Sequence, residues 1–225
     1  MSEEAGILKR DSPTVYFGTT NTHKFGEAKS ILGTLNIKLK RLNEKGIEIQ
    51  SEQLEAIADY AVKSLAQRSN SPVIVEDAGL FIDSLSGFPG PYSSFVHKTI
   101  GLEGILCLMD GKKRRSATFL SVVSFCGQGL GPRTFRGVVR GKITAKIEGT
   151  KGFGFDPIFM PEKGNGKTFA EMTLDEKNLL SHRARSLRRF AQWYLSTRTL
   201  RGESPNSHEC TRAYPTSKCA RQQSA

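Results

Sequence analysis

Residues 51–80 read SEQLEAIADYAVKSLAQRSNSPVIVEDAGL, and this stretch decides the fold class. Its first part carries apolar residues at the spacing of one helix face, namely Leu54, Ile57, Ala58, Ala61 and Leu65. That spacing predicts a helix over residues 52–68, with Ser51 as its N-cap. The apolar run at 72–75 follows and predicts a short buried strand that runs directly into Glu76 and Asp77.

The chain before this stretch shows the same order of elements. A run of β-branched and aromatic residues predicts a strand at 14–19. Ile31, Leu32 and Leu35 give an apolar stripe to a helix predicted at 23–35, and a second strand is expected at 37–42. The first half of the chain therefore alternates β-α-β-α-β, which is typical of an α/β protein with a sheet and flanking helices.

The chain after Asp77 predicts a less regular half. GFPGP at 87–91 is a turn-rich loop, and a short helix is expected at 102–109. Three strands separated by glycine turns are then predicted, paired in antiparallel or mixed fashion, at 117–125, 133–139 and 142–147.

The last helix sets the domain boundary. Thr173 and Glu176 have the spacing of a capping box, which predicts a helix from there to about Ser196. Its buried stripe would consist of Leu180, Ala184, Leu187, Ala191 and Tyr194. From residue 199 the sequence is polar and without periodicity, so we expect one domain over 1–198 and a disordered polar tail over 199–225.

The composition indicates a soluble globular protein. Hydrophobic residues make up 37% of the chain, and no window approaches the roughly 18 uninterrupted apolar residues of a membrane helix. The N-terminus has no apolar run of the signal-peptide type. Cys107 and Cys126 lie in apolar runs and are expected to be buried free thiols, which suits a reducing compartment. We therefore expect a cytoplasmic protein with no membrane partner.

The net charge is the one unusual bulk property. The formal charge is +11, from 33 Lys and Arg against 22 Asp and Glu. A basic excess favours polyanionic partners, which include nucleotides, nucleic acids and anionic membrane surfaces. The charge alone does not choose among them.

The first candidate site is the turn between the first predicted strand and helix. A helix N-terminus binds phosphate through free N–H groups, and hydroxyl, amide and ammonium groups add donors. An ordinary capped turn is the alternative reading. The residues concerned are Thr19, Thr20, Asn21, Thr22, His23 and Lys24.

The second candidate is acidic. Glu76 and Asp77 follow a buried strand, at the position where α/β sheets usually bind ligands, and paired carboxylates suit Mg²⁺. Glu48 and Glu52 could supply further acidic groups to the same metal. Acidic residues are also favoured near a helix N-terminus for purely structural reasons.

The third candidate combines an aromatic loop with a basic segment. The sequence GFGFDP at 152–157 places two rings between glycines, so a flat base could stack on Phe153 or Phe155 while Asp156 accepts from its polar edge. The alternative is a glycine turn whose rings anchor the core. Further along, cations beside a histidine fit phosphate oxygens and a base carbonyl, at Lys177, His182 and Arg183.

These pieces, in this order, resemble one family, the inosine triphosphate pyrophosphatases, also called XTP/dITP diphosphatases. The matching segments are TTNTHK (19–24), IEIQSE (47–52), VEDAGLFIDSLSGFPGPYSS (75–94), GFGFDPIF (152–159) and TFAEMTLDEKNLLSHRARSL (168–187). The resemblance spans about residues 14–197. Each motif alone is modest, but the ordered set is specific.

The resemblance implies roles for particular residues. The loop at 19–24 would hold the triphosphate, with Lys24 also catalytic. The metal-binding acid before the second helix falls on Glu48 or Glu52. The catalytic and metal-binding aspartate would be Asp77, followed by a backbone contact at Ala78. The family often has Ser or Thr at the position of Ala78, so a side-chain hydroxyl contact is absent here.

The remaining implied contacts come from three places. A lysine of the second helix would be Lys63, and the base loop would comprise Phe153, Gly154, Phe155 and Asp156. Lys177, His182 and Arg183 would complete the substrate site. Adenine would be rejected because its 6-amino donor would meet a donor of the protein.

The implied fold is an elongated α/β protein with a central mixed sheet, two lobes and an active-site cleft between them. The implied activity is Mg²⁺-dependent hydrolysis of ITP, dITP and XTP to the monophosphate and pyrophosphate, by a homodimer that does not require nucleic acid. Two other hypotheses remain open at this point. One is a pyrophosphatase for modified pyrimidine nucleotides, and the other is a nucleic-acid-binding module suggested by the charge.

Overall fold

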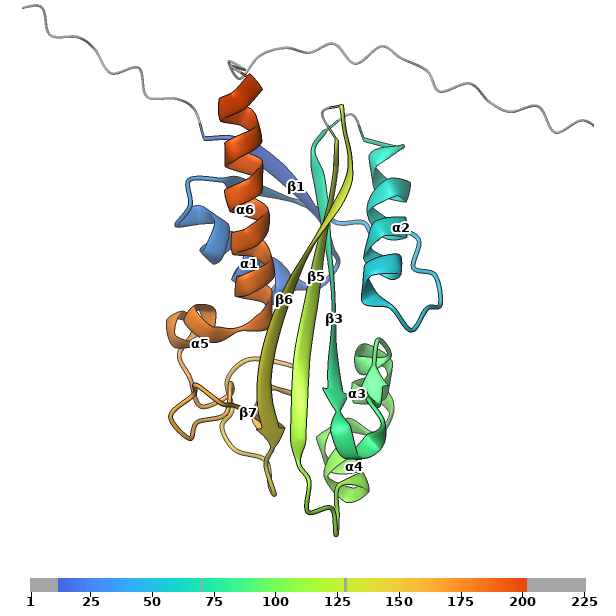
Figure 1. Cartoon of the computed structure of the whole chain (residues 1–225), viewed down its shortest axis with the longest axis vertical. Helices are drawn as coiled ribbons and strands as arrows, with labels where there is room; N and C mark the ends of the chain where they lie inside the picture. The colour runs from blue at the N-terminus through green and yellow to red at the C-terminus, as the bar shows by residue number, and fades with distance from the viewer. Residues whose placement is uncertain (1–11, 70, 128, 202–225) are drawn as a thin grey trace, which may run out of the picture.

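The computed structural model describes residues 12–69, 71–127 and 129–201. Their strands form one sheet in the order β2-β1-β3-β5-β6-β7, with the short β4 paired to β3 (Figure 1). The pairs β2-β1 and β1-β3 are parallel, and the pairs from β3 to β7 are antiparallel. The strands are β1 Thr14–Gly18, β2 Lys38–Leu42, β3 Val73–Ile82, β4 Pro89–Gly90, β5 Ser116–Gly127, β6 Leu130–Ile143 and β7 Phe159–Pro161.

Helices cover both faces of this sheet. One core packs α1 and α6 against one face, and a second packs α2 against β3 and β5. The third core lies toward the far end of the long strands, beside α3 and α4 (Figure 1). The helices are α1 Thr22–Gly33, α2 Leu54–Ala66, α3 Ser93–Thr99, α4 Gly101–Leu108, α5 Leu174–Leu180 and α6 His182–Arg201.

The molecule is elongated along β5 and β6 (Figure 1). One lobe holds β1, β2, α1, α2 and most of α6, and the other holds α3, α4 and the segment around β7. The α/β class with a mixed central sheet is therefore confirmed. None of the helices in the described ranges has the length and apolarity needed to cross a lipid bilayer.

Strand β3 differs from its prediction in a way that matters for function. It does not end at Asp77 but continues to Ile82, paired with β5 along its whole length. Pairing with β1 is confined to Val73 and Ile74, because β1 ends at Gly18. The acidic residues therefore lie in the middle of a strand, just beyond the end of its parallel neighbour.

Strand β6 was predicted as two strands with a glycine turn between them, and that prediction is wrong. It is one strand from Leu130 to Ile143, and 144–147 is not a strand. Gly141, which was predicted to lie in a turn, is inside this strand, as is Gly137. A Cβ on Gly137 would collide with the carbonyl oxygen of His182 and lie 2.5 Å from the nitrogen of Ser186. These glycines permit close approach of neighbouring backbone.

Helix ends also depart from the predictions. Ser51 is not the N-cap of α2; Gln53 occupies that position, and the Ser51 hydroxyl accepts from the Gln53 N–H at 3.1 Å. The single helix predicted from Thr173 is two helices, although the capping box itself is confirmed. Ser181 is extended between them, and its hydroxyl accepts from the Ala184 N–H at 3.2 Å. This break places His182 and Arg183 in the first turn of α6.

The termini and cysteines complete the comparison. Helix α6 continues to Arg201, past the predicted end at Ser196 and the boundary at 198. The rest of the predicted tail, 202–225, lies outside the described residues, as do 1–11. Cys107 is exposed and Cys126 is half-buried, so the expectation that both are buried is wrong.

The contact at Gly137 gives a testable consequence. Gly137→Ala should destabilise the protein by about 2 kcal/mol or more, because α6 must move away from β6. Gly131→Ala, on the same strand with nothing within 4 Å of an added Cβ, is the matched control. We expect it to be neutral or slightly stabilising. Urea unfolding would measure the free energy of unfolding of both variants. Equal values would contradict the close packing of α6 on Gly137.

Candidate active site

A cleft of about 900 Å³ lies between the two lobes. Its walls come from the start of α1, the loop before α2, one face of α2, the middle of β3, helix α3, the 153–156 loop and the start of α6. Most residues proposed from sequence line it: Thr19, Asn21, Lys24, Glu48, Asp77, Ala78, Phe153, Gly154, Phe155, Asp156, His182 and Arg183. Six do not: Thr20, Thr22, His23, Glu52, Lys63 and Lys177.

Asn21, in the turn between β1 and α1, caps the N-terminus of α1. The Asn21 side-chain oxygen accepts from the N–H groups of His23 and Lys24 at 2.9 and 3.1 Å. Arg41 braces the turn from β2 by donating to the carbonyl oxygens of Thr19 and Thr20. The turn is therefore pre-organised, and its contribution to the cleft is the ammonium group of Lys24.

The centre of the cleft is a buried carboxylate held by two cations. Glu76 lies 2.9 Å from the Lys24 ammonium and 3.2 Å from Arg183 Nε, and it accepts from the Ser121 hydroxyl at 2.8 Å. Burial alone would raise the pKa of Glu76, but Arg183 and Lys24 hold that pKa well below its usual range. Glu76 is therefore a fixed anion that positions Lys24.

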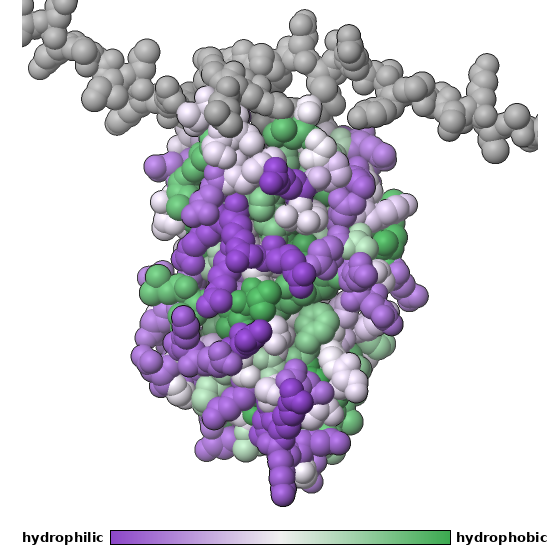
Figure 2. Space-filling view, in the orientation of Figure 1, coloured by the Kyte–Doolittle hydropathy of each residue, from purple (hydrophilic) through white to green (hydrophobic). Residues whose placement is uncertain are grey.

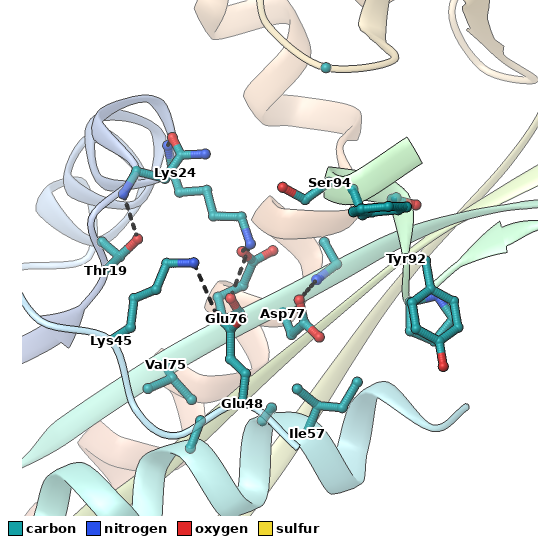
Figure 3. A pocket seen from close by; sticks show the side chains of 18 of the residues that line it. Thr19, Lys24, Lys45, Glu48, Ile57, Val75, Glu76, Asp77, Tyr92 and Ser94 are labelled. Atoms are coloured by element: carbon teal, nitrogen blue, oxygen red, sulfur yellow. Dashed lines mark hydrogen bonds and ion pairs between the residues drawn. The ribbon is translucent and has the colours of Figure 1, made fainter. Parts of the chain in front are cut away.

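Asp77, the next residue along β3, has the opposite electrostatics. Burial raises the pKa of Asp77 to about 6, against the pull of Lys24, and the neighbouring Glu76 and Glu48 raise it further. One carboxylate oxygen accepts from the Ala78 N–H at 3.0 Å. Figure 3 shows Asp77 beside Glu76, with Lys24 and Lys45 reaching in from the same side. A carboxyl group that titrates near neutral pH in a cleft is suited to proton transfer.

Glu48 and Glu52, the two acids considered as metal ligands before α2, differ in position. Glu48 lines the cleft and pairs with Lys45 at 3.3 Å, whereas Glu52 is exposed and does not line it. In the described part of the chain no three His, Cys, Asp or Glu side chains are grouped closely enough to hold a metal by themselves. Asp77 and Glu48 would supply two carboxylates, the number with which Mg²⁺ is often bound when phosphates supply further oxygens.

A second buried ion network lies behind the cleft. Glu27 of α1 accepts from Lys177 at 2.6 Å and from Arg183 at 2.5 Å, and Lys177 also donates to Asp156 at 2.5 Å. Burial would raise the pKa of Glu27, but Arg183 and Lys177 lower it to about 2. Lys177 is thus enclosed behind the cleft wall, with its ammonium group already neutralised.

Sequence reasoning missed Glu27, Lys45 and helix α3. A signal for Glu27 existed, because it is one position before Ala28 and four before Ile31, on the buried stripe of α1. A carboxylate at such a position needs a buried partner. Helix α3 and the residue before it contribute Tyr92, Ser94, Phe95, His97 and Lys98 to the cleft, and the turn-rich sequence before this helix hid it.

The 153–156 loop makes one wall of the cleft aromatic. Phe153 is half-buried, with the ring of His23 stacked 5.1 Å from it and the cations of Lys177 and Arg183 at 4.9 and 5.3 Å. Phe155 belongs to the third core and is 3% exposed. Of the two rings, Phe153 is therefore the one that remains partly exposed at the cleft.

His182 is a buried residue of the cleft lining. Its ring stacks on Phe119 at 4.4 Å, and its Nδ1 is buried without a hydrogen-bond partner among the described residues. Burial and the positive charge of Arg183 keep the pKa of His182 well below its usual value. The imidazole is neutral at pH 7, so it presents one donor and one acceptor.

Comparison with known proteins decides the family. The model of the Ham1 family matches residues 15–193, which include every element that lines the cleft. The chain belongs to the Ham1 family. Its relatives include two proteins named dITP/XTP pyrophosphatase. That of Methanopyrus kandleri is 50% identical over 180 residues, covering 80% of this chain and 95% of the relative. That of Pyrococcus horikoshii is 49% identical over 179 residues, with the same shares covered.

Solved structures of the Ham1 family share the fold. The Staphylococcus aureus Ham1 protein superposes with a TM-score of 0.71 at 26% identity, covering 82% of this chain and 99% of that one. The Coxiella burnetii HAM1 protein gives a TM-score of 0.72 at 26% identity, with the same coverage. The shared architecture thus extends over nearly the whole of each of those proteins.

The electrostatics of Asp77 give a prediction for the metal-free protein. Because its folded pKa lies above the unfolded value of 3.8, its protonated form stabilises the fold below pH 4, and this is lost as the pH rises through about 6. Asp77→Asn should therefore be more stable than wild type by about 2–3 kcal/mol at pH 7.5 in EDTA. Urea unfolding of wild type and variant at pH 4 and pH 7.5 would measure this difference in stability. A variant less stable than wild type at pH 7.5 would refute this environment.

Proposed function

We propose that this protein is a nucleoside triphosphate pyrophosphohydrolase that acts on non-standard purine nucleotides such as ITP, dITP and XTP. The observation that carries the proposal is that one cleft brings together groups suited to a phosphate and groups suited to a base. Asp77, with its raised pKa, and Lys24 line the same cleft as Phe153 and the neutral His182. The names of the relatives agree with this reading.

The reaction proposed is attack of water on the α-phosphorus. Asp77 accepts a proton from the water as the new P–O bond forms. The bond from the α-phosphorus to the bridging oxygen breaks, and pyrophosphate leaves. Lys24 and Lys45 both line this end of the cleft and neutralise the β- and γ-phosphates.

Lys63 and Lys177, which the resemblance assigned to substrate binding, are given other roles. Lys63 does not line the cleft and pairs with Asp59 at 2.6 Å. Lys177 is enclosed with Glu27 and Asp156, so its contribution is to position the 153–156 loop and Arg183 rather than to meet phosphate. Because Glu76 is fully engaged by Lys24 and Arg183, the carboxylates free to serve a cation are Asp77 and Glu48.

We infer that Mg²⁺ binds at Asp77 and Glu48 together with the substrate phosphates. When bound, a divalent cation supplies charge neutralisation and a more acidic water. The like charges that raise the pKa of Asp77 in its absence are what such a cation would balance.

Base selection is assigned to Phe153 and His182. Phe153 stacks against the purine, and the unpartnered Nδ1 of His182 meets the 6-oxo group as a donor. Adenine carries an amino donor at that position, so two donors would face each other in a buried site. Mismatches of this kind discriminate by orders of magnitude.

We also propose that the protein acts in the cytoplasm as a homodimer. Helices α3 and α4, with the residues that flank α3, expose Tyr92, Phe95, Ile100 and Leu108, and Phe95 is 67% exposed. An exposed apolar group of this kind is typical of a protein interface. Size-exclusion chromatography with light scattering would measure the mass of the protein in solution. The mass of a single chain would contradict the proposed dimer.

The proposed activity is tested by pyrophosphate release from ITP, XTP, dITP, GTP, ATP and dUTP, with Mg²⁺ and with EDTA. We expect strong release from the first three with Mg²⁺ only. Asp77→Asn should lower turnover by about 100-fold or more while remaining folded. Release from dUTP in preference to the purines would favour a pyrimidine enzyme, and near-normal turnover of Asp77→Asn would remove Asp77 from the chemistry.

The two rings of the base loop give a matched pair of variants. Phe153→Ala should raise KM for XTP about 10-fold, with a small change in stability, because this ring is half-buried at the cleft. Phe155→Ala should destabilise the fold by about 3–5 kcal/mol, because it empties a core position. Steady-state kinetics and thermal unfolding of both variants separate the roles. The reverse pattern would mean that Phe155 holds the base.

A further inference from the structure

The charge excess of the chain is not explained by the cleft. The central cations there are matched by buried carboxylates: Lys24 pairs with Glu76, and Lys177 pairs with Glu27 and Asp156. Arg183 lies between Glu27 and Glu76. The net charge of +11 therefore resides largely on surfaces that the proposed reaction does not use.

A second hollow, of about 320 Å³, lies where β6 meets β7 and α6. Four cations line it, Arg140, Lys163, Arg185 and Arg189, against the single acid Glu162. In the ranges that the structure describes, none of the four cations forms an ion pair. The hollow shares no lining residue with the cleft, so both could be occupied together.

Two of these cations are fixed in place by the edge of the sheet. Arg185 donates to the carbonyl oxygen of Val138 at 2.8 Å, and Arg189 donates to that of Arg136 at 2.7 Å. A guanidinium group has five N–H donors, so several remain free on each side chain. The arginines thus cover an open strand edge and still present positive charge outward.

The line of charge continues along the seam between α6 and β6. One turn beyond Arg189, Trp193 packs under the guanidinium of Arg133 at 5.1 Å. From Arg133 to Arg140 the strand rises about 23 Å, and because they lie seven positions apart, their side chains leave opposite faces of the sheet. The line of charge therefore follows the outer edge of β6 rather than one face of it. Figure 2 shows hydrophilic side chains over the visible side of α6 and β6, with apolar side chains among them. Arg136 is not counted in the line, because it pairs with Glu55 of α2 at 2.9 Å.

We propose that this seam, formed by Arg133, Arg140, Lys163, Arg185 and Arg189, binds the phosphate backbone of nucleic acid. A length of about 23 Å spans several successive phosphates, since the repeat along one strand of a duplex is about 3.4 Å. A single small anion would use only part of such a line. An anionic membrane is disfavoured because the large exposed apolar side chains of the described residues lie on elements other than β6 and α6.

The test measures binding of a fluorescein-labelled 20-nucleotide RNA by anisotropy at several KCl concentrations. We expect a Kd of about 1–100 µM at 50 mM KCl and a slope of log K against log[KCl] of about −3.5, for roughly five contacts. The double variant Arg140→Glu/Lys163→Glu should bind at least about 10-fold more weakly, with a slope shallower by about 1.4. Within 12–69, 71–127 and 129–201 neither side chain forms a hydrogen bond or an ion pair, so the fold should not depend on them.

The matched control is Lys112→Glu/Lys113→Glu, which changes the net charge equally at exposed positions after α4. It should bind RNA within about threefold of wild type, and both double variants should keep wild-type pyrophosphate release. Equal loss of RNA binding in the two double variants would overturn the proposal, as would no salt-dependent binding. Binding of inorganic pyrophosphate or of phosphatidylserine vesicles at the seam, without RNA binding, would overturn it as well. None of these results bears on the proposed hydrolysis.

Discussion

The structure depends on one arrangement of buried charge. Arg183, in the first turn of α6, lies between Glu27 of α1 and Glu76 of β3, and so ties two helices to the central strand. Removing one partner of such a pair costs several kcal/mol, because it leaves the other charge buried and uncompensated. The relative positions of α1, β3 and α6 are therefore set by electrostatics as well as by their apolar cores, and the cleft lies at their meeting point.

This arrangement gives the adjacent carboxyl groups of Glu76 and Asp77 different properties: the first is held rigidly and the second can react. Glu76 has its carboxylate oxygens satisfied by cations and a hydroxyl, so it is an inert anion at any pH near neutrality. Asp77 points to the other side of the strand and keeps only one backbone donor. A strand places successive side chains on opposite faces, so one Glu-Asp pair supplies both a structural ion pair and a group that titrates near pH 6.

The local patterns predicted the elements well and the long-range contacts poorly. Helical spacing found α1 and α2, and the capping box found the start of α5, because these signals lie within a few residues. The unbroken path of β3 through Glu76 and Asp77 was missed, since polar residues there are stabilised by partners far away in sequence. Gly141 was read as a turn for the same reason: it is glycine because the backbone of β7, about 20 residues later, lies against it. At the site, motif order brought most residues to the cleft, but Glu27 and the enclosure of Lys177 follow only from packing.

The measurement that tests the account most directly is unfolding and turnover of Glu27→Gln. Because the folded pKa of Glu27 is about 2 and its ordinary value is 4.5, its ionised form contributes about 3 kcal/mol above pH 4.5, lost as the pH falls toward 2. We predict a variant less stable by at least that amount at pH 7, with a gap that narrows below pH 4.5 and with reduced kcat/KM for XTP. Wild-type stability and turnover at pH 7 would contradict the claim that this buried ion network sets the cleft.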